Sequence, residues 1–151
     1  MSAPQIFVGI DVAKAHLDVA LRPTGERWTV ANADASLAAL VAQLQAVAPT
    51  LIVLEATGGY QRAVVAALAA AGLPVVVANP RQTRDFAKAT GQLAKTDALD
   101  ARALAHFAEA VRPSPRPLPD AQTEALRARP DWCARWCRGC RPGRRAVGPA
   151  R

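Results

Sequence analysis

Residues 5–32, QIFVGIDVAKAHLDVALRPTGERWTVAN, hold three short apolar segments with brief connections between them. The first segment, 5–12, is a compact apolar run with an aspartate near its end, and in the second, 16–22, apolar residues alternate with less apolar ones. The third segment, 26–32, follows a short Pro-Thr-Gly turn. This pattern predicts a meander of three strands.

The rest of the first 111 residues alternates between helical and strand patterns. Apolar residues repeat at helical spacing after Ser36, a candidate N-cap, and Gly72 is placed to end a second helix. The expected elements are a helix from Ser36, a buried strand at 50–56, a helix at 58–72, a buried strand at 73–80, a polar helix or loop at 81–92 and a helix from 93. This order predicts an α/β fold with a mixed sheet covered by helices.

Two aspartates open the last of these helices, in the stretch LAKTDALDARALA at 93–105. At about 100° per residue, one core-facing stripe holds Asp97, Asp100, Leu104, Phe107, Ala108 and Val111. Arg102, His106 and Glu109 fall on the opposite side and suit solvent. Two carboxylates turned toward a core need a partner, and a divalent metal ion would serve. A second interpretation is helix capping, with Thr96 or Asp97 as the N-cap.

Two further acids stand at the ends of predicted strands. Asp11 closes the run FVGID and Glu55 closes LIVLE. Ligands of α/β sheets gather at the carboxyl ends of strands, so both acids are expected at the same rim as Asp97 and Asp100. Each acid taken alone is also compatible with a strand-end residue that is solvated at a loop. Four carboxylates at one rim predict a site for magnesium or manganese, which prefer oxygen ligands.

The positive charge of the chain is confined to its last quarter. The formal net charge is +7, yet residues 1–111 hold nine basic and nine acidic side chains. Residues 112–151 hold ten arginines against three acids, and also all three cysteines. We find no apolar run long enough to span a membrane and no secretory leader, so we expect a cytoplasmic protein that does not bind membranes.

Three stretches together resemble a known protein family: FVGIDVAKAHLDVAL, LEATGGY and VVVANPRQTRDFAKATGQLAKTDALDARALA. They are similar to the N-terminal catalytic domain of the DEDD transposases of the insertion sequence 110 type, and the resemblance covers residues 5 to about 127. It implies a RuvC-like, ribonuclease-H-type fold. It also implies that Asp11, Glu55, Asp97 and Asp100 are catalytic and hold Mg²⁺ or Mn²⁺ for phosphoryl transfer in DNA cleavage and strand exchange.

The same resemblance implies partners and a division of the chain. Members of the family recombine DNA under the guidance of a structured RNA, act as homo-oligomers, and carry a nucleophilic serine in a second, C-terminal domain. We therefore expect a catalytic domain at 1–111, and a proline-rich linker with the start of a helix at 112–128. The remaining residues, 129–151, are expected to be a disordered tail rich in arginine and cysteine.

Several residues near the predicted rim are candidates for nucleic-acid contacts. They are Gly58, Gly59, Tyr60, Arg81, Arg84, Lys88 and Lys95. The glycines could offer backbone N–H groups to a phosphate, or could serve only a tight turn between strand and helix. The basic side chains could contact a DNA backbone, or could be solvated surface charges. His16 and His106 are interpreted as surface residues outside the carboxylate rim.

The tail departs from the family. The family continues after 118–128 along an amphipathic helix, whereas 129–151 has no apolar period and is dense in arginine, glycine and proline. That composition is typical of a shifted reading frame in GC-rich DNA, and we hypothesise such a shift near Arg129. The three cysteines of the tail are one ligand short of the four that a structural zinc site requires. Without the serine-bearing domain, we expect a transposase fragment that cannot complete recombination.

Two other functions compete with this interpretation. The first is a non-catalytic remnant of a transposase that only binds nucleic acid. The second is an actin-like or sugar-kinase ATP-binding domain, which shares the ribonuclease-H topology and a first strand with Gly-Ile-Asp. Such a domain requires a Gly-Thr or Gly-Ser phosphate loop after that aspartate, whereas this chain continues DVAKAH.

Overall fold

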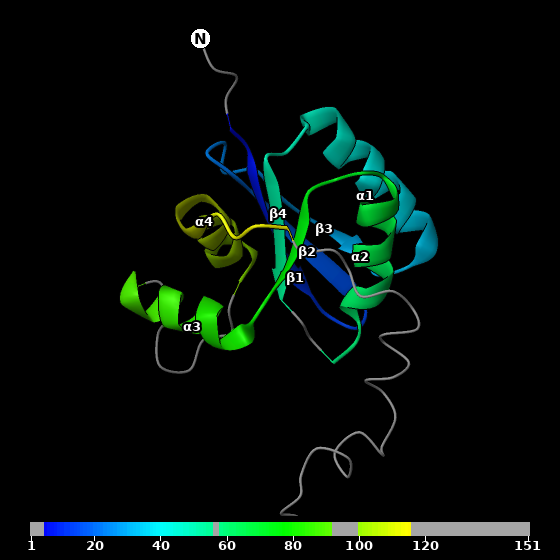
Figure 1. The fold of residues 1–151 in the computed structure, drawn as a ribbon. Helices are drawn as coiled ribbons and strands as arrows, with labels where there is room; N and C mark the ends of the chain where they lie inside the picture. Colours follow the sequence, from blue (N-terminus) through cyan, green and yellow to red (C-terminus); the bar gives the residue numbers. More distant parts are fainter. Residues whose placement is uncertain (1–4, 56–57, 92–99, 116–151) are drawn as a thin grey trace, which may run out of the picture. The chain divides into compact units, whose positions relative to one another are not determined.

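The computed structural model describes residues 5–55, 58–91 and 100–115, and their central feature is a five-stranded mixed sheet (Figure 1). The elements in chain order are β1 (Phe7–Val12), β2 (His16–Arg22), β3 (Arg27–Ala31), α1 (Asp34–Val47), β4 (Leu51–Glu55), α2 (Gln61–Ala70), β5 (Val75–Ala78), α3 (Pro80–Ala89) and α4 (Ala101–Val111). The strand order is β3-β2-β1-β4-β5. The predicted mixed α/β sheet is therefore confirmed.

The sheet combines an antiparallel and a parallel half. Strands β1, β2 and β3 pair antiparallel, as a meander with short connections requires. Strand β4 pairs parallel to β1, and β5 pairs parallel to β4. Each of these parallel additions follows a helix, α1 before β4 and α2 before β5. The carboxyl ends of β1, β4 and β5 consequently meet at one rim of the sheet.

Helices cover both faces of the sheet. Figure 1 shows α1 and α2 on one side of the strands and α3 and α4 on the other. In β1, Val8, Ile10 and Val12 belong to the core that includes α1 and α2. Phe7 belongs to the second core, with residues of α3 and α4. Because side chains alternate along a strand, Gly9 and Asp11 also face α4.

Several element boundaries differ from those expected. Helix α1 begins at Asp34 with Ala33 as its N-cap, so Ser36 is not the cap. Helix α2 begins at Gln61 rather than at 58, because Gly58 and Gly59 have φ values of 55° and 91°, which no right-handed helix contains. The C-cap of α2 is Ala71, one residue before the expected Gly72.

The polar stretch at 81–92, predicted as helix or loop, forms most of helix α3. The side-chain oxygen of Asn79 accepts a hydrogen bond from the backbone N–H of Arg81 at 2.9 Å, which makes Asn79 the N-cap. Pro80 occupies the first helical position, where its missing N–H costs nothing. Two local signals therefore start this helix despite its polar composition.

Helix α4 begins at Ala101 rather than at 93, so Asp100 precedes the helix instead of lying on its stripe. The stripe itself differs from the prediction at two further residues. Leu104, Phe107 and Ala108 are buried as expected, but Val111 is 49% exposed because the helix ends there. His106, expected in solvent, packs edge-on against Phe86 of α3 with ring centroids 5.0 Å apart. Helical periodicity within α4 alone cannot reveal such contacts with the neighbouring helix α3.

Glu109, which was also expected to face solvent, forms an ion pair with a strand residue. Its carboxylate accepts a charge-assisted hydrogen bond of 2.6 Å from the Nε atom of Arg22, which joins α4 to β2.

In the described part of the chain, no helix is long and apolar enough to cross a membrane. Asp97, Lys95 and nearly all of the expected linker and tail, from 116 onward, lie outside the described residues.

Candidate nuclease site

Two of the predicted acids lie at the carboxyl ends of neighbouring parallel strands, Asp11 as the last residue but one of β1 and Glu55 as the last residue of β4. Ile10 of β1 is the register partner of Leu54 of β4, and Asp11 and Glu55 are the next residue of each strand. Ile10 and Leu54 both pack toward α1 and α2. Since side chains alternate, Asp11 and Glu55 both face α3 and α4, and both are partly buried. The register therefore places the two carboxylates side by side at one rim.

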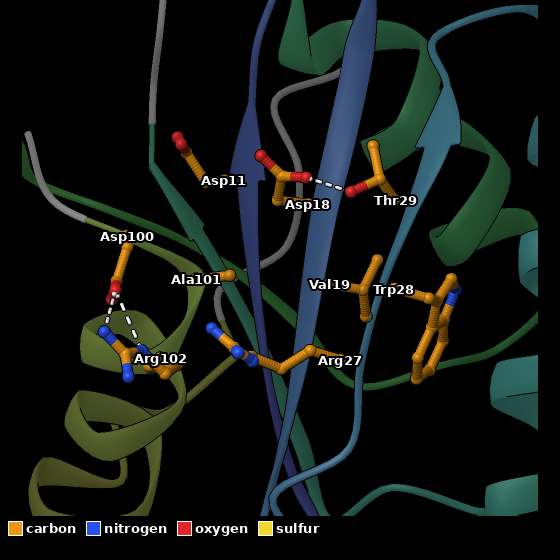
Figure 2. A pocket seen from close by; sticks show the side chains of 9 residues that line it. All are labelled: Asp11, Asp18, Val19, Arg27, Trp28, Thr29, Asp100, Ala101 and Arg102. Carbon is orange, nitrogen blue, oxygen red and sulfur yellow. Dashed lines mark hydrogen bonds and ion pairs between the residues drawn. The ribbon is translucent and has the colours of Figure 1, made fainter.

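A glycine brings the third acid close to this pair. A Cβ atom at Gly9 would lie 2.1 Å from the backbone oxygen of Ala101 and 2.3 Å from the backbone nitrogen of Ala105. The first turn of α4 thus rests directly on the backbone of β1, which only glycine permits. Asp100 precedes that turn, and it lines the same pocket as Asp11 (Figure 2).

Asp100 is the N-cap of α4. Its Oδ1 atom accepts a hydrogen bond of 2.8 Å from the backbone N–H of Ala103, and its Oδ2 atom lies 3.0 Å from the guanidinium of Arg102. The capping interpretation expected Thr96 or Asp97 in this role, and the cap is three residues further along than Asp97. Capping also fixes the position of the Asp100 carboxylate, so the cap and a place beside Asp11 are compatible.

Burial and mutual repulsion act on the two strand-end acids. Desolvation raises the pKa of Asp11 above its ordinary value, and the charges of Asp18 and Asp100 raise it further. Desolvation also raises the pKa of Glu55, against the lowering effects of the Arg84 charge and of a 3.4 Å hydrogen bond from the Thr83 hydroxyl. The charge of Asp11 adds to the rise at Glu55. These carboxylates therefore interact with one another.

Asp18 is an acid of this site that the sequence analysis missed. It is the direct register partner of Asp11 on β2, so its carboxylate lies on the same face of the sheet. It accepts a hydrogen bond from the Thr29 hydroxyl, and the Nε2 atom of His16 lies 3.6 Å from its Oδ2 atom. His16 is exposed as expected, but it stands next to the carboxylates. The signal available was the alternation of 16–22, which turns Asp18 away from Leu17 and Val19.

The other candidate residues lie at different places around the rim. Gly58 and Gly59 form the turn before α2, and Tyr60 beside them is 44% exposed. Arg81, Arg84 and Lys88 are on α3, and among them Arg84 influences Glu55. No contact with nucleic acid follows from these positions alone, so this part of the prediction stays a prediction. The roles of the four predicted acids likewise remain predictions.

The comparisons with known proteins identify the family. A family model described as Transposase, for DEDD transposases of the insertion sequence 110 type, matches residues 8–129. The chain belongs to this transposase family. A search of curated proteins found no match. The family expected from the sequence motifs is therefore confirmed.

Solved structures agree with this assignment at the level of the fold. T. thermophilus RuvC in complex with Holliday junction substrate superposes on this transposase chain with a TM-score of 0.52 at 16% identity, covering 75% of this chain and 100% of that chain. The expected RuvC-like fold is confirmed. An inorganic polyphosphate/ATP-glucomannokinase from Arthrobacter sp. strain KM has a TM-score of 0.43 at 18% identity, covering 63% of this chain and 52% of that chain. That score is too low to support a kinase.

The raised pKa values predict how the stability of the metal-free transposase domain depends on pH. An acid with a raised pKa in the folded state disfavours folding when it is ionised, and this penalty disappears as the pH falls toward the ordinary values of 3.8 for Asp11 and 4.5 for Glu55. The double variant Asp11→Asn, Glu55→Gln lacks the penalty. We expect its advantage in melting temperature over the wild type to be present at pH 7 and to shrink on acidification. An advantage that is constant with pH would contradict the raised pKa values.

Proposed function

We propose that this domain cleaves DNA by divalent-metal-dependent phosphoryl transfer, with Asp11, Glu55, Asp97 and Asp100 as ligands of Mg²⁺ or Mn²⁺. The observation that carries the proposal is the register of β1 and β4, which sets Asp11 beside Glu55 on the face covered by α4. Close contact of α4 with Gly9 adds Asp100 to this face. Asp97 is included through the family motif alone, because it lies outside the described residues.

The donor atoms fit a hard divalent cation. Carboxylate oxygens are the ligands that Mg²⁺ and Mn²⁺ prefer. Within the described ranges, no three acidic, histidine or cysteine side chains are close enough together to hold a metal ion. Repulsion among carboxylates favours such separation in the absence of a cation, and the raised pKa of Asp11 has the charges of Asp18 and Asp100 among its causes. A bound cation would remove this repulsion.

The residues of the chain have distinct tasks in this mechanism. The metal, when bound, supplies charge to stabilise the attacking and leaving oxygens of the phosphoryl transfer. Asp11 interacts with both Asp100 and Glu55, which makes it the carboxylate shared across the site. The Thr83 hydroxyl, 3.4 Å from Oε2 of Glu55, orients that carboxylate. The N–H of Ala103 and the guanidinium of Arg102 orient Asp100.

The direct test is cleavage of branched DNA by the full chain. The fold neighbour RuvC was solved with a Holliday junction, so a synthetic four-way junction is a suitable probe. We expect strand cleavage with Mg²⁺ or Mn²⁺ and none in EDTA, because the phosphoryl transfer depends on the cation. Linear duplex DNA of the same sequence is the control that shows whether the protein prefers branched DNA. Cleavage that persists in EDTA, or no cleavage with either cation, would contradict the proposal.

We further propose the finer features that the family implies. The partners are DNA and a structured guide RNA, full-length relatives act as homo-oligomers, and residues 1–111 are the catalytic unit. Family membership supports these proposals, and the distribution of charge is consistent with them because ten arginines follow residue 111. Arginine-rich segments bind nucleic acids through phosphate contacts. Complete strand exchange would require the serine-bearing domain that the family pattern includes.

A further inference from the structure

A pocket of about 290 Å³ lies beside the carboxylates, between the β2–β3 side of the sheet and the first turn of α4. The strands contribute Asp18, Arg27 and Thr29, and the helix contributes Asp100 and Arg102 (Figure 2). Its volume is just below the usual range for small-molecule sites, which suits one small chemical group. The pocket therefore extends the carboxylate site toward the edge strand β3.

Small side chains pack between β2 and α4, and one of them, Ala101, lines the pocket. Ala20 of β2 is buried together with Ala101 and Ala105 of α4. Arg27 of β3 is the register partner of Ala20 and so lies on the same face of the sheet. Figure 2 shows the Arg27 side chain extending from β3 across β2 toward the first turn of α4. A larger residue at position 20 would obstruct that path.

Two guanidinium groups consequently reach one pocket from opposite sides. Arg102 is held by Asp100, with its Nε and Nη2 atoms each 3.0 Å from Oδ2. Arg27 is exposed, and within residues 5–55, 58–91 and 100–115 it takes part in no ion pair. Like charges that share a pocket favour an anion between them, and the planar fork of arginine matches a phosphate group.

Apart from the Asp100–Arg102 ion pair, the opposite charges are separated along the pocket. Asp11 and Asp18 lie where β1 ends and β2 begins, whereas Arg27 is near the other end of the β2–β3 pairing. The Asp18 carboxylate already accepts a hydrogen bond from Thr29. A nucleic-acid strand could thus place one phosphate at the carboxylate site with its metal and the next at the two arginines.

We propose that Arg27 and Arg102 bind the phosphodiester next to the one that is cleaved, so that the DNA strand crosses the site from the acids toward β3. This inference rests on the proposed function, which places the cleaved phosphate at the carboxylates. Arg27 is a positioning residue in this account, since it holds the strand without touching the reacting atoms. Neither the family motifs nor the predicted acids include it.

The test measures binding of a short, fluorescently labelled oligothymidine to the full chain in EDTA. We expect Arg27→Ala to weaken binding about 10-fold at low ionic strength, because a charge-assisted hydrogen-bond pair is lost. The slope of log affinity against log salt should also fall by about 0.7, the value for one phosphate contact on a single strand. Arg27→Lys should recover the slope but only part of the affinity, since it keeps the charge and loses the fork.

Arg62→Ala is the matched control, because it removes one positive charge from α2, on the opposite face of the sheet. It should leave both the affinity and the slope nearly unchanged. The melting temperatures of Arg27→Ala and Arg27→Lys should equal that of the wild type, as Arg27 is exposed. If Arg27→Ala binds with the same affinity and slope as Arg62→Ala, the proposal is overturned.

Two further outcomes separate this inference from the proposed function. If the wild type fails to cleave junction DNA while Arg27→Ala still loses binding and slope, the nuclease function is wrong and the phosphate contact stands. If cleavage depends on metal while Arg27→Ala behaves like Arg62→Ala, the nuclease function stands and the phosphate contact at Arg27 is wrong. Oligouridine distinguishes the source of the phosphate, because dependence on Arg27 with RNA but not with DNA would overturn the assignment to a DNA strand.

Discussion

Gly9→Ala will destabilise the domain by about 3 kcal/mol, the upper part of the range for overpacking a well-packed interior. The added methyl would lie 2.1 Å from the oxygen of Ala101, 2.3 Å from the nitrogen of Ala105 and 2.9 Å from the carbonyl carbon of Leu104. All three are backbone atoms, so no side-chain rotation can relieve the contact. For a domain of about 100 residues this corresponds to a fall in melting temperature of roughly 10–20 °C.

Gly72→Ala is the matched control for this prediction. Gly72 has a φ of 73° and nothing within 4 Å of an added Cβ, so alanine there costs only backbone strain, about 1 kcal/mol. Chemical denaturation monitored by circular dichroism measures both variants. If Gly9→Ala were no more destabilising than Gly72→Ala, the close contact between β1 and α4 would be wrong, and with it the placement of Asp100 beside Asp11.

Asp11→Asn will lower the rate of metal-dependent junction cleavage by about 100-fold or more, since even outer-sphere partners of metal ligands are worth 10- to 100-fold. Asp11 interacts with Asp18, Asp100 and Glu55, so its loss affects the whole set of carboxylates. Asparagine keeps the size of the side chain and removes its charge. We therefore expect the variant to fold and to bind DNA in EDTA at least as tightly as the wild type.

Glu26→Gln provides the control for charge in the cleavage assay. Glu26 is exposed, and its backbone pairs with Leu21, at the end of β2 away from Asp18. Its substitution should leave the cleavage rate unchanged. An Asp11→Asn chain that cleaves as fast as Glu26→Gln would remove Asp11 from the catalytic site.

The strands could be predicted from the sequence because each is a short apolar or alternating run, although the run at 73–80 extends two residues beyond β5 at each end. The segment at 16–22 has the observed bounds, and the run at 50–56 differs from β4 by one residue at each end. Helix beginnings were less predictable. The start of α2 depends on two glycines with positive φ, and that of α3 on the side chain of Asn79, features that periodicity does not contain.

The candidate site could be predicted only where a motif or a strand end marked it. Asp11 and Glu55 stand out because they close apolar runs. Asp18 and Arg27 do not, since each lies within or at the start of an ordinary strand, and only the register of three strands brings them to one pocket. The role of Gly9 was also hidden, because a glycine within a strand does not reveal which helix lies against it.

The most direct test of the carboxylate site is the melting temperature of the full chain as Mn²⁺ is added, for the wild type, Asp11→Asn and Glu26→Gln. Without metal we expect Asp11→Asn to be more stable than the wild type at pH 7, because the pKa of Asp11 is raised in the folded state. With Mn²⁺, the wild type and Glu26→Gln should gain stability in a saturable manner, and Asp11→Asn should not. Equal gains in all three chains would contradict a metal site built on Asp11.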